Sequence, residues 1–221
     1  MPVAPERIVL ITGASRGIGA QVALQLAAPG THVIVNYREK ADRADSTAQA
    51  IRDAGGQATT IAADLADDAA TATMIDAIRT RFGRLDAVIL NASAGLHQGA
   101  EPGHAMRVNG DAQKRLAALA MPLMPVGARF VYVTSHQAHF FPHKAVPKGY
   151  AAIAVGKRAG ESALYAMRSE FDHAGIGFTV VSGDLVDDTI VMRAAAIAKA
   201  ATHAPSPGIV FVGRADNLMT A

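Results

Sequence analysis

The 221-residue sequence contains no cysteine, which excludes both a disulfide framework and thiolate chemistry. Charge of one sign is also scarce, because the formal net charge is only +2 with the histidines neutral. Such a small excess gives no reason to expect a basic surface that binds nucleic acid or an anionic membrane. We therefore predict neither a nucleic-acid partner nor a membrane partner.

Long apolar runs, low-complexity linkers and fixed-period repeats are missing as well. No stretch approaches the roughly 20 apolar residues that span a bilayer, and residues 1–6 lack the charged and apolar regions of a secretory signal. We therefore expect a cytoplasmic location. Hydrophobic residues make up 50% of the sequence, enough to bury one substantial core, so we predict that residues 1–221 form a single domain.

An apolar run meets three glycines between residues 7 and 19, in the sequence R-I-V-L-I-T-G-A-S-R-G-I-G. The run 8–11 predicts a strand buried on both faces, and the spacing of Ile18, Val22 and Leu26 predicts a helix after it. Unpaired N–H groups at a helix N-terminus attract phosphate. Glycines alone could mark a simple tight turn, but their place between a strand and a helix favours a pyrophosphate site.

Further apolar runs predict strands near residues 32–36, 58–62, 87–90, 130–133, 178–181 and 209–213, with helical patterns between them, including one long helix over 106–124. Alternation of strands and helices is typical of a parallel sheet. We therefore predict an α/β fold with a single Rossmann-type, doubly wound parallel sheet of about seven strands and helices on both faces. Such sheets bind ligands at the carboxyl ends of their strands.

The residues after the second predicted strand bear on the choice of nucleotide. An acid there would accept a hydrogen bond from the ribose 2′-OH of NAD, whereas this chain has Asn36, Tyr37 and Arg38. Arg38 can neutralise a 2′-phosphate, and Arg16 would approach it from the glycine loop. Each arginine alone could be a solvated surface charge. Together they favour NADP(H) over NAD(H).

The segment T-G-A-S-R-G-I-G, residues 12–19, resembles the cofactor loop of the short-chain dehydrogenase/reductase family, whose members bind NAD(H) or NADP(H) on a doubly wound sheet. The resemblance extends over nearly the whole chain. It implies that the cofactor contacts Gly13, Ser15, Arg16, Gly17, Ile18, Gly19, Asn36, Tyr37, Arg38, Asp64, Leu65, Asn91, Ala92, Ser93, Lys157, Gly183 and Asp184.

Some of these residues have plainer alternatives. Asp64 and Leu65 would flank the adenine, but Asp64 could equally belong to a strand-to-helix turn in which Asp67 caps the helix. Asn91 and Ser93 would brace the central strand by hydrogen bonds from side chain to backbone. Thr189 could reach the diphosphate or the carboxamide. The short, alanine-rich stretch 191–207 stands where the family has a substrate lid, which suggests an open pocket or a missing segment.

The same resemblance implies four catalytic residues: Ser135 would polarise the substrate oxygen, Tyr150 would transfer a proton, Lys157 would hold the nicotinamide ribose and Asn109 would organise a water at a helix kink. A plain serine at a strand end and an asparagine turned to solvent are the alternatives.

The spacing of the tyrosine and the lysine departs from the family pattern Tyr-x-x-x-Lys. Six residues separate Tyr150 from Lys157, as in an atypical Tyr-x6-Lys subgroup that the segment resembles, and Ile153 stands four residues before the lysine. On a helix, residues four apart rise about 6 Å and residues seven apart about 10.5 Å, so the lysine should act less on the phenol. We expect Pro147 and Gly149 to let Tyr150 donate its proton from a displaced, non-helical first turn.

Three histidines, His136, His139 and His143, fall in the predicted loop after Ser135. A zinc site is one explanation, but no carboxylate follows closely in the sequence, so we predict a polar pocket loop and no metal. A proton relay through His136 or His139 stays open if Tyr150 is not the donor.

Two functions remain. The first is an NADP(H)-dependent, ketoreductase-like oxidoreductase that transfers a hydride between nicotinamide and a small-molecule carbonyl or alcohol substrate. The second is a catalytically impaired dinucleotide-binding protein that acts as a sensor or partner, which the irregular Tyr150–Lys157 spacing suggests. The resemblance also implies a homodimer or homotetramer built from the helices of Asn109 and Lys157.

Overall fold

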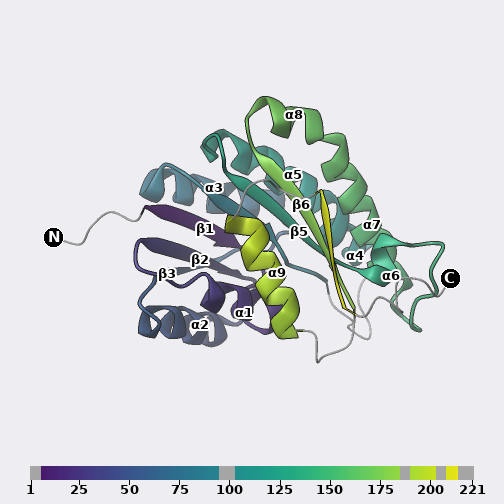
Figure 1. Ribbon diagram of the computed structural model, residues 1–221, viewed down its shortest axis with the longest axis horizontal. Helices are drawn as coiled ribbons and strands as arrows, with labels where there is room; N and C mark the ends of the chain where they lie inside the picture. The colour runs from purple at the N-terminus through teal and green to yellow at the C-terminus, as the bar shows by residue number, and fades with distance from the viewer. Residues whose placement is uncertain (1–5, 95–102, 185–189, 203–207, 214–221) are drawn as a thin grey trace.

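Seven parallel strands form one sheet in the order β3-β2-β1-β4-β5-β6-β7 (Figure 1). The computed structural model describes residues 6–94, 103–184, 190–202 and 208–213. The doubly wound α/β fold predicted from the sequence is confirmed. The strands are β1 (Arg7–Ile11), β2 (Thr31–Tyr37), β3 (Gln57–Ala62), β4 (Ala87–Leu90), β5 (Arg129–Ser135), β6 (Gly177–Gly183) and β7 (Ile209–Val212).

Helices cover both faces of the sheet (Figure 1). One face carries α1 (Gly17–Gln25), α2 (Ala41–Asp53) and α9 (Ile190–Thr202). The other carries α3 (Asp68–Phe82), α5 (Ala112–Ala120), α7 (Ala151–Ala166) and α8 (Arg168–His173). Two short helices, α4 (His104–Met106) and α6 (His136–His139), lie near α7. Across the described part of the chain, every helix is too short or too polar to cross a bilayer.

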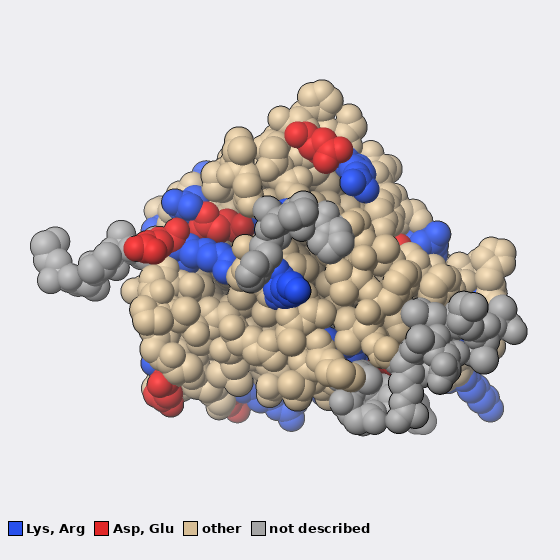
Figure 2. Space-filling model, in the orientation of Figure 1, with Lys and Arg blue, Asp and Glu red and all other residues tan. Residues whose placement is uncertain are grey.

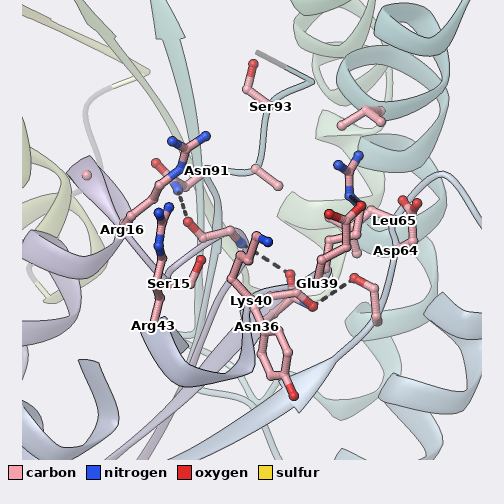
Figure 3. Close-up of a pocket in the computed structure, with 18 of the residues that line it drawn as sticks. Ser15, Arg16, Asn36, Glu39, Lys40, Arg43, Asp64, Leu65, Asn91 and Ser93 are labelled. Carbon is pink, nitrogen blue, oxygen red and sulfur yellow. Dashed lines mark hydrogen bonds and ion pairs between the residues drawn. The ribbon is translucent and has the colours of Figure 1, made fainter. Parts of the chain in front are cut away.

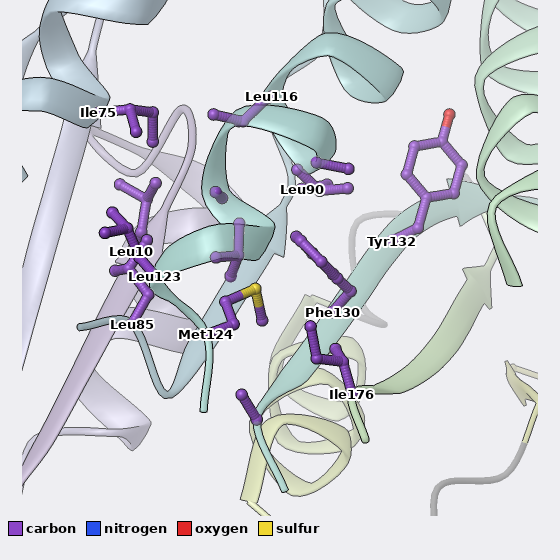
Figure 4. Close-up of a cluster of buried hydrophobic side chains, with 14 of the residues drawn as sticks. Leu10, Ile75, Leu85, Leu90, Leu116, Leu123, Met124, Phe130, Tyr132 and Ile176 are labelled. Atoms are coloured by element: carbon purple, nitrogen blue, oxygen red, sulfur yellow. The ribbon is translucent and has the colours of Figure 1, made fainter. Parts of the chain in front are cut away.

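Alternate strand residues face two separate apolar cores. Ile8 and Leu10 of β1 point into the cluster drawn in Figure 4, whereas Val9 and Ile11 point into the cluster under α1, α2 and α9. This period of two, with both faces buried, explains why the strand sequences are continuously apolar. On the face shown in Figure 2, basic and acidic side chains lie in small groups of both signs, consistent with the small net charge.

The segment between α4 and β5 corrects the prediction of one continuous helix over 106–124. The chain there forms α4, a π-helical turn (Arg107–Asp111), α5 and a 3-10 turn (Met121–Leu123). α7 approaches the π turn closely, since a Cβ on Gly156 would lie only 3.2 Å from the Cβ of Asn109. Pro122, which cannot donate a backbone hydrogen bond, falls in the 3-10 turn.

The turn after β3 bears out the plainer alternative for that segment. Asp67 caps α3, and its Oδ1 accepts from the backbone N–H groups of Ala69 at 2.8 Å and Ala70 at 3.1 Å. The helix ends at Gly83, whose φ of 69° is the left-handed conformation that glycine adopts without strain.

We predict that replacing Gly160 by alanine destabilises the fold, although alanine has the higher helix propensity of the two residues. Gly160 lies on α7 where a Cβ would collide with the carbonyl oxygen of Asn109 in the π turn. Alanine in a helix interior ordinarily gains about 0.5–1 kcal/mol over glycine, but overpacking costs about 1–3 kcal/mol. Urea unfolding of Gly160→Ala should show a net loss, whereas Ser162→Ala, at an exposed position of the same helix, should be neutral or stabilising.

Candidate functional site

A cavity of about 650 Å³ opens at the carboxyl ends of β1, β2 and β4 (Figure 3). Fourteen of the predicted cofactor residues line it: Gly13, Ser15, Arg16, Gly17, Ile18, Gly19, Asn36, Tyr37, Arg38, Asp64, Leu65, Asn91, Ala92 and Ser93. The other three, Lys157, Gly183 and Asp184, are outside this lining and lie near β5 and β6 instead. The structure therefore brings most of the predicted nucleotide site together in one place.

The glycine loop fits closely against the end of β4. A Cβ on Gly13 would lie 2.9 Å from the Cα of Ala92, and one on Gly19 would lie 2.6 Å from Nδ2 of Asn91. These two glycines are thus required by the packing of the chain itself. Gly17 differs, because a Cβ there would meet nothing within 4 Å, and its φ is +58°. Only Gly17 leaves open space at the start of α1.

Asn91 joins β4 to the glycine loop as expected. Its Nδ2 donates to the carbonyl oxygens of Thr12 at 2.9 Å and Gly13 at 3.2 Å, and its backbone N–H donates to Thr12 Oγ1 at 3.0 Å. Asn36 has a similar role from the other side. Its Oδ1 accepts from the N–H of Gly13 at 3.2 Å, and its Nδ2 donates to the carbonyl oxygen of Ala63 at 3.2 Å. Asn36 therefore fixes the loop rather than presenting a free amide to the cavity.

Four basic side chains surround the outer part of the cavity, and sequence reasoning found only Arg16 and Arg38. The structure adds Lys40 and Arg43, which lie at the N-cap and in the first turn of α2. Figure 3 shows Arg16 and Arg43 side by side, with Lys40 nearby. The sequence could have indicated both residues, because they follow β2 closely and the carboxyl ends of the strands are where such sheets bind ligands.

Sequence reasoning at the end of the second strand covered only Asn36, Tyr37 and Arg38 and did not consider the acid that follows them. β2 continues to Tyr37 rather than ending at Asn36, so the turn falls later, and Glu39 lines the same cavity. Oε1 of Glu39 lies 2.9 Å from Nε of Arg38, and both side chains are largely exposed. Exposed pairs of this kind are weak, typically worth under about 1 kcal/mol, so the pair can open for a ligand.

Asp64 is partly committed to its own turn. Its Oδ1 accepts from the backbone N–H of Ala66 at 2.9 Å, the geometry of an Asx turn. Oδ2 does not take part in that bond, and Asp64 lines the cavity. The structure thus shows the turn expected for Asp64 and its place in the cavity lining, and its contact with adenine stays a prediction.

The hydroxyl groups of Ser135 and Tyr150 are in contact, with 2.9 Å between Oγ and Oη. Ser135 ends β5, while Tyr150 is the N-cap of α7 and precedes the helix proper. Tyr150 therefore reaches the serine from the first turn, as the displaced arrangement requires. Burial raises the pKa of Tyr150, and this effect is opposed by the Ser135 hydrogen bond and by the positive charge of Arg193.

Lys157 is buried on α7, seven residues after Tyr150. Its Nζ donates to the carbonyl oxygen of Val133 at 3.1 Å. Burial, followed by the charge of Arg193, lowers the pKa of Lys157 to about 8. The positive charge that opposes the raised pKa of Tyr150 comes from Arg193, whereas sequence reasoning considered only the lysine and expected its effect on the phenol to be weakened.

Arg193 is a residue of the site that sequence reasoning missed. It lies on α9 and is 7% exposed, and its side chain passes directly over Gly183 at the end of β6, where any Cβ would collide with it. Gly183 pairs in register with Ser135 of β5. The available signal in the sequence was an arginine on the buried, alanine-rich face of a helix.

α9 also corrects the prediction of a substrate lid, because residues 190–202 pack on the sheet. Thr189 lies outside the described residues.

Asn109 lies in the π turn and is 1% exposed, so the alternative of an asparagine turned to solvent is wrong. Its Oδ1 accepts from the backbone N–H of Ala94 at 3.2 Å. Its Nδ2 is buried and has no hydrogen-bond partner among the residues that the structure describes. A buried donor of this kind is suited to a ligand or a water.

Two of the three histidines after Ser135, His136 and His139, have side-chain hydrogen-bond partners. Nδ1 of His136 lies 2.9 Å from Oγ of Ser182, and Nδ1 of His139 lies 2.7 Å from Oε1 of Glu161. Burial lowers the pKa of His136, and the charge of Asp184 opposes this. Glu161 is the carboxylate that appeared distant in the sequence. The described residues contain no group of three or more metal-ligating side chains.

Residues 7–200 match the family model for short chain dehydrogenase. The chain is 35% identical over 188 residues to a 1-cyclohexenylcarbonyl-CoA reductase of Streptomyces collinus, which covers 82% of this chain and 65% of that protein. It is 31% identical over 175 residues to the hydroxynaphthalene reductase arp2 of Aspergillus fumigatus, covering 76% of this chain and 62% of that one. The chain thus spans slightly less than two thirds of the length of these relatives.

Solved structures share the fold. The landomycin C-6 ketoreductase LanV, determined with bound NADP and rabelomycin, has a TM-score of 0.80 at 24% identity, covering 93% of this chain and 94% of that one. The reductase LugOII, which catalyses keto-reduction at C1 during lugdunomycin biosynthesis, has a TM-score of 0.80 at 25% identity and covers 96% of both chains. These likenesses do not define a subgroup by its tyrosine–lysine spacing.

We predict that Arg193→Met raises the pKa of Lys157 above its value of about 8. The substitution keeps much of the side-chain volume over Gly183 but removes the like charge that disfavours the ammonium. A titration of Lys157 Nζ by ¹⁵N NMR measures the change. Arg158→Met, which removes the neighbouring cation on α7, should leave the Lys157 titration where it is, and equal shifts in both variants would contradict the assignment to Arg193.

Proposed function

The chain belongs to the short-chain dehydrogenase family, and we propose that it is an NADP(H)-dependent ketoreductase acting on a small carbonyl or alcohol substrate. The observation that carries this proposal is the contact between the Ser135 and Tyr150 hydroxyls. It lies at the carboxyl end of β5, the edge of the sheet at which the basic cavity also opens. A proton donor and a hydrogen-bond donor are thus available at the edge where such folds bind ligands.

The residues present fit a dinucleotide phosphate. The open start of α1 at Gly17 suits a diphosphate, since its N–H groups carry the positive end of the helix dipole. Arg16, Lys40 and Arg43 suit the additional 2′-phosphate. When bound, the cofactor supplies or accepts a hydride at its nicotinamide ring.

The proposed reduction divides the work between a few side chains. Ser135 donates a hydrogen bond to the substrate oxygen, which polarises the carbonyl and stabilises the developing alkoxide. Tyr150 gives its phenolic proton to that oxygen as the hydride reaches the carbon. Lys157 orients the ribose through its ammonium, and Arg193 favours the phenolate that remains after proton transfer. In the oxidative direction the same proton returns to Tyr150.

We predict that Arg43 contributes to discrimination between the two nicotinamide nucleotides. Replacing Arg43 or Arg16 by alanine should weaken NADPH binding about 10- to 100-fold, the effect of one charge-assisted phosphate contact, and change NADH binding little. Isothermal calorimetry with both nucleotides measures this. Arg52→Ala is the matched control, because Arg52 lies at the exposed far end of the same helix. Equal losses for NADPH and NADH would contradict a 2′-phosphate contact.

The test of the reaction is a screen of carbonyl compounds that follows NADPH absorbance. Tyr150→Phe should lower kcat about 10²- to 10⁴-fold on any substrate found, the usual size of a general-acid contribution, with NADPH affinity unchanged. Undiminished turnover by Tyr150→Phe would exclude this tyrosine as the proton donor. NADPH binding without turnover of any carbonyl compound would favour the second function, a dinucleotide-binding protein that has lost catalysis.

A further inference from the structure

Glu161 is a fully buried carboxylate on α7, 0% exposed, and both of its partners bind the same oxygen. Oε1 lies 2.7 Å from Nδ1 of His139 and 3.2 Å from Nη1 of Arg158. Oε2 is buried and has no hydrogen-bond partner among the described residues. A buried charge with incomplete hydrogen bonding generally costs more than an apolar residue of similar size. The carboxylate therefore calls for an explanation other than stability.

Of its two partners, His139 is the one held in the interior. The His139 side chain is 16% exposed and that of Arg158 is 42% exposed. Arg158 is also three residues from Glu161 on the same helix, so this pair links α7 only to itself. The bond to His139 spans 22 residues of sequence and joins α6 to α7. The ring of His139 is further packed edge-on against Phe140 and Phe211, with centroids 4.7 and 5.4 Å apart.

The helix that His139 ends is the one that Ser135 begins. Ser135 is the N-cap of α6, and its Oγ accepts from the backbone N–H of Ala138 at 3.2 Å while it contacts Tyr150. A helix of four residues has no stability of its own. The orientation of the Ser135 hydroxyl therefore depends on what holds α6 in place. His136 anchors the start of α6 to Ser182 of β6, and the bond from His139 to Glu161 is the polar contact that joins its last residue to α7.

A small apolar cluster also joins α6 to the start of α7. Ala138 of α6 packs against Tyr150, Ile153 and Ala154 of the α7 segment. Ile153 stands four residues before Lys157, so an apolar residue fills the turn of α7 between the tyrosine and the lysine. Tyr150 is thus left one turn further from the lysine, and its contacts are with α6 and Ser135.

We propose that His139 and Glu161 are positioning residues: their hydrogen bond fastens α6 to α7 and so keeps the hydroxyls of Ser135 and Tyr150 in register at the displaced tyrosine. Neither residue touches the reacting atoms. The consequence for catalysis rests on the proposed ketoreductase function, whereas the fastening itself does not.

The first arm of the test needs no substrate. In His139→Ala, hydrogen exchange at the Ala138 and Phe140 amides should accelerate about 10- to 100-fold, because α6 opens locally. His139→Asn, whose amide N–H can stand in for Nδ1, should restore most of the protection. Arg158→Met removes the other partner of Glu161 and should leave α6 protected. Unchanged exchange at Ala138 in His139→Ala would overturn the proposal whether or not the protein proves to be an enzyme.

A second variant separates positioning from folding. His139→Ala leaves Glu161 buried beside a weaker partner and could destabilise the whole protein, whereas Glu161→Leu removes the buried charge. Glu161→Leu should therefore keep or raise the melting temperature and still accelerate exchange at Ala138. The double variant His139→Ala/Glu161→Leu should add little to either single change. A fall in melting temperature that accounts for the faster exchange would show an ordinary stability effect and overturn the proposal.

The second arm measures catalysis on a carbonyl substrate from the screen. His139→Ala and Glu161→Leu should lower kcat about tenfold or more, since small displacements of catalytic groups are costly, with the NADPH dissociation constant unchanged. The Asn variant should recover kcat in parallel with its amide protection. Unchanged kcat in a variant with faster exchange would overturn the positioning role. If the wild-type protein reduces no carbonyl compound, the proposed function fails while the exchange data still decide whether the fastening exists.

Discussion

The hydrogen bonds from Asn91 to the carbonyl oxygens of Thr12 and Gly13 are the interaction on which the proposed nucleotide site depends. They join the ends of the paired strands β1 and β4, after which the chain continues to helices on opposite faces of the sheet, and they hold the glycine loop against the end of β4. The loop has no Cβ at Gly13 or Gly19 because Asn91 and Ala92 occupy that space. The cavity is therefore shaped first by contacts within the chain, and its ligand-binding properties follow from them.

The electrostatics of the proposed catalytic region come from more than one layer of the fold. Tyr150 caps α7 and Lys157 belongs to it, on one face of the sheet, and Arg193 comes from α9 on the other. Burial lowers the pKa of Lys157, and the like charge of Arg193 acts in the same direction, so that the pKa falls to about 8. The charge of Arg193 also opposes the rise that burial causes in the pKa of Tyr150. This charge comes from α9, so it does not depend on the distance between the tyrosine and the lysine.

The sequence was sufficient for what depends on local pattern. Apolar runs located the strands, and the strand–glycine–helix order located the cavity, because both are properties of consecutive residues. The π turn at Asn109, the pairing of His139 with Glu161 and the approach of Arg193 to Gly183 depend on contacts between distant segments. Tertiary packing sets such features, and no spacing rule within one element encodes them. The acid at Glu39 was missed for a smaller reason, a strand that runs one residue further than its apolar run.

The packing of α9 against α1 links two parts of the candidate site. α1 and α9 lie against each other on the same face of the sheet (Figure 1). The first of these helices starts at the glycine loop, and the second delivers Arg193 over the end of β6. Because close-packed interiors transmit displacement rather than absorb it, these two helices behave as a single stiff unit. The proposed phosphate site at the start of α1 and the charge of Arg193 on α9 therefore belong to one rigid part of the structure.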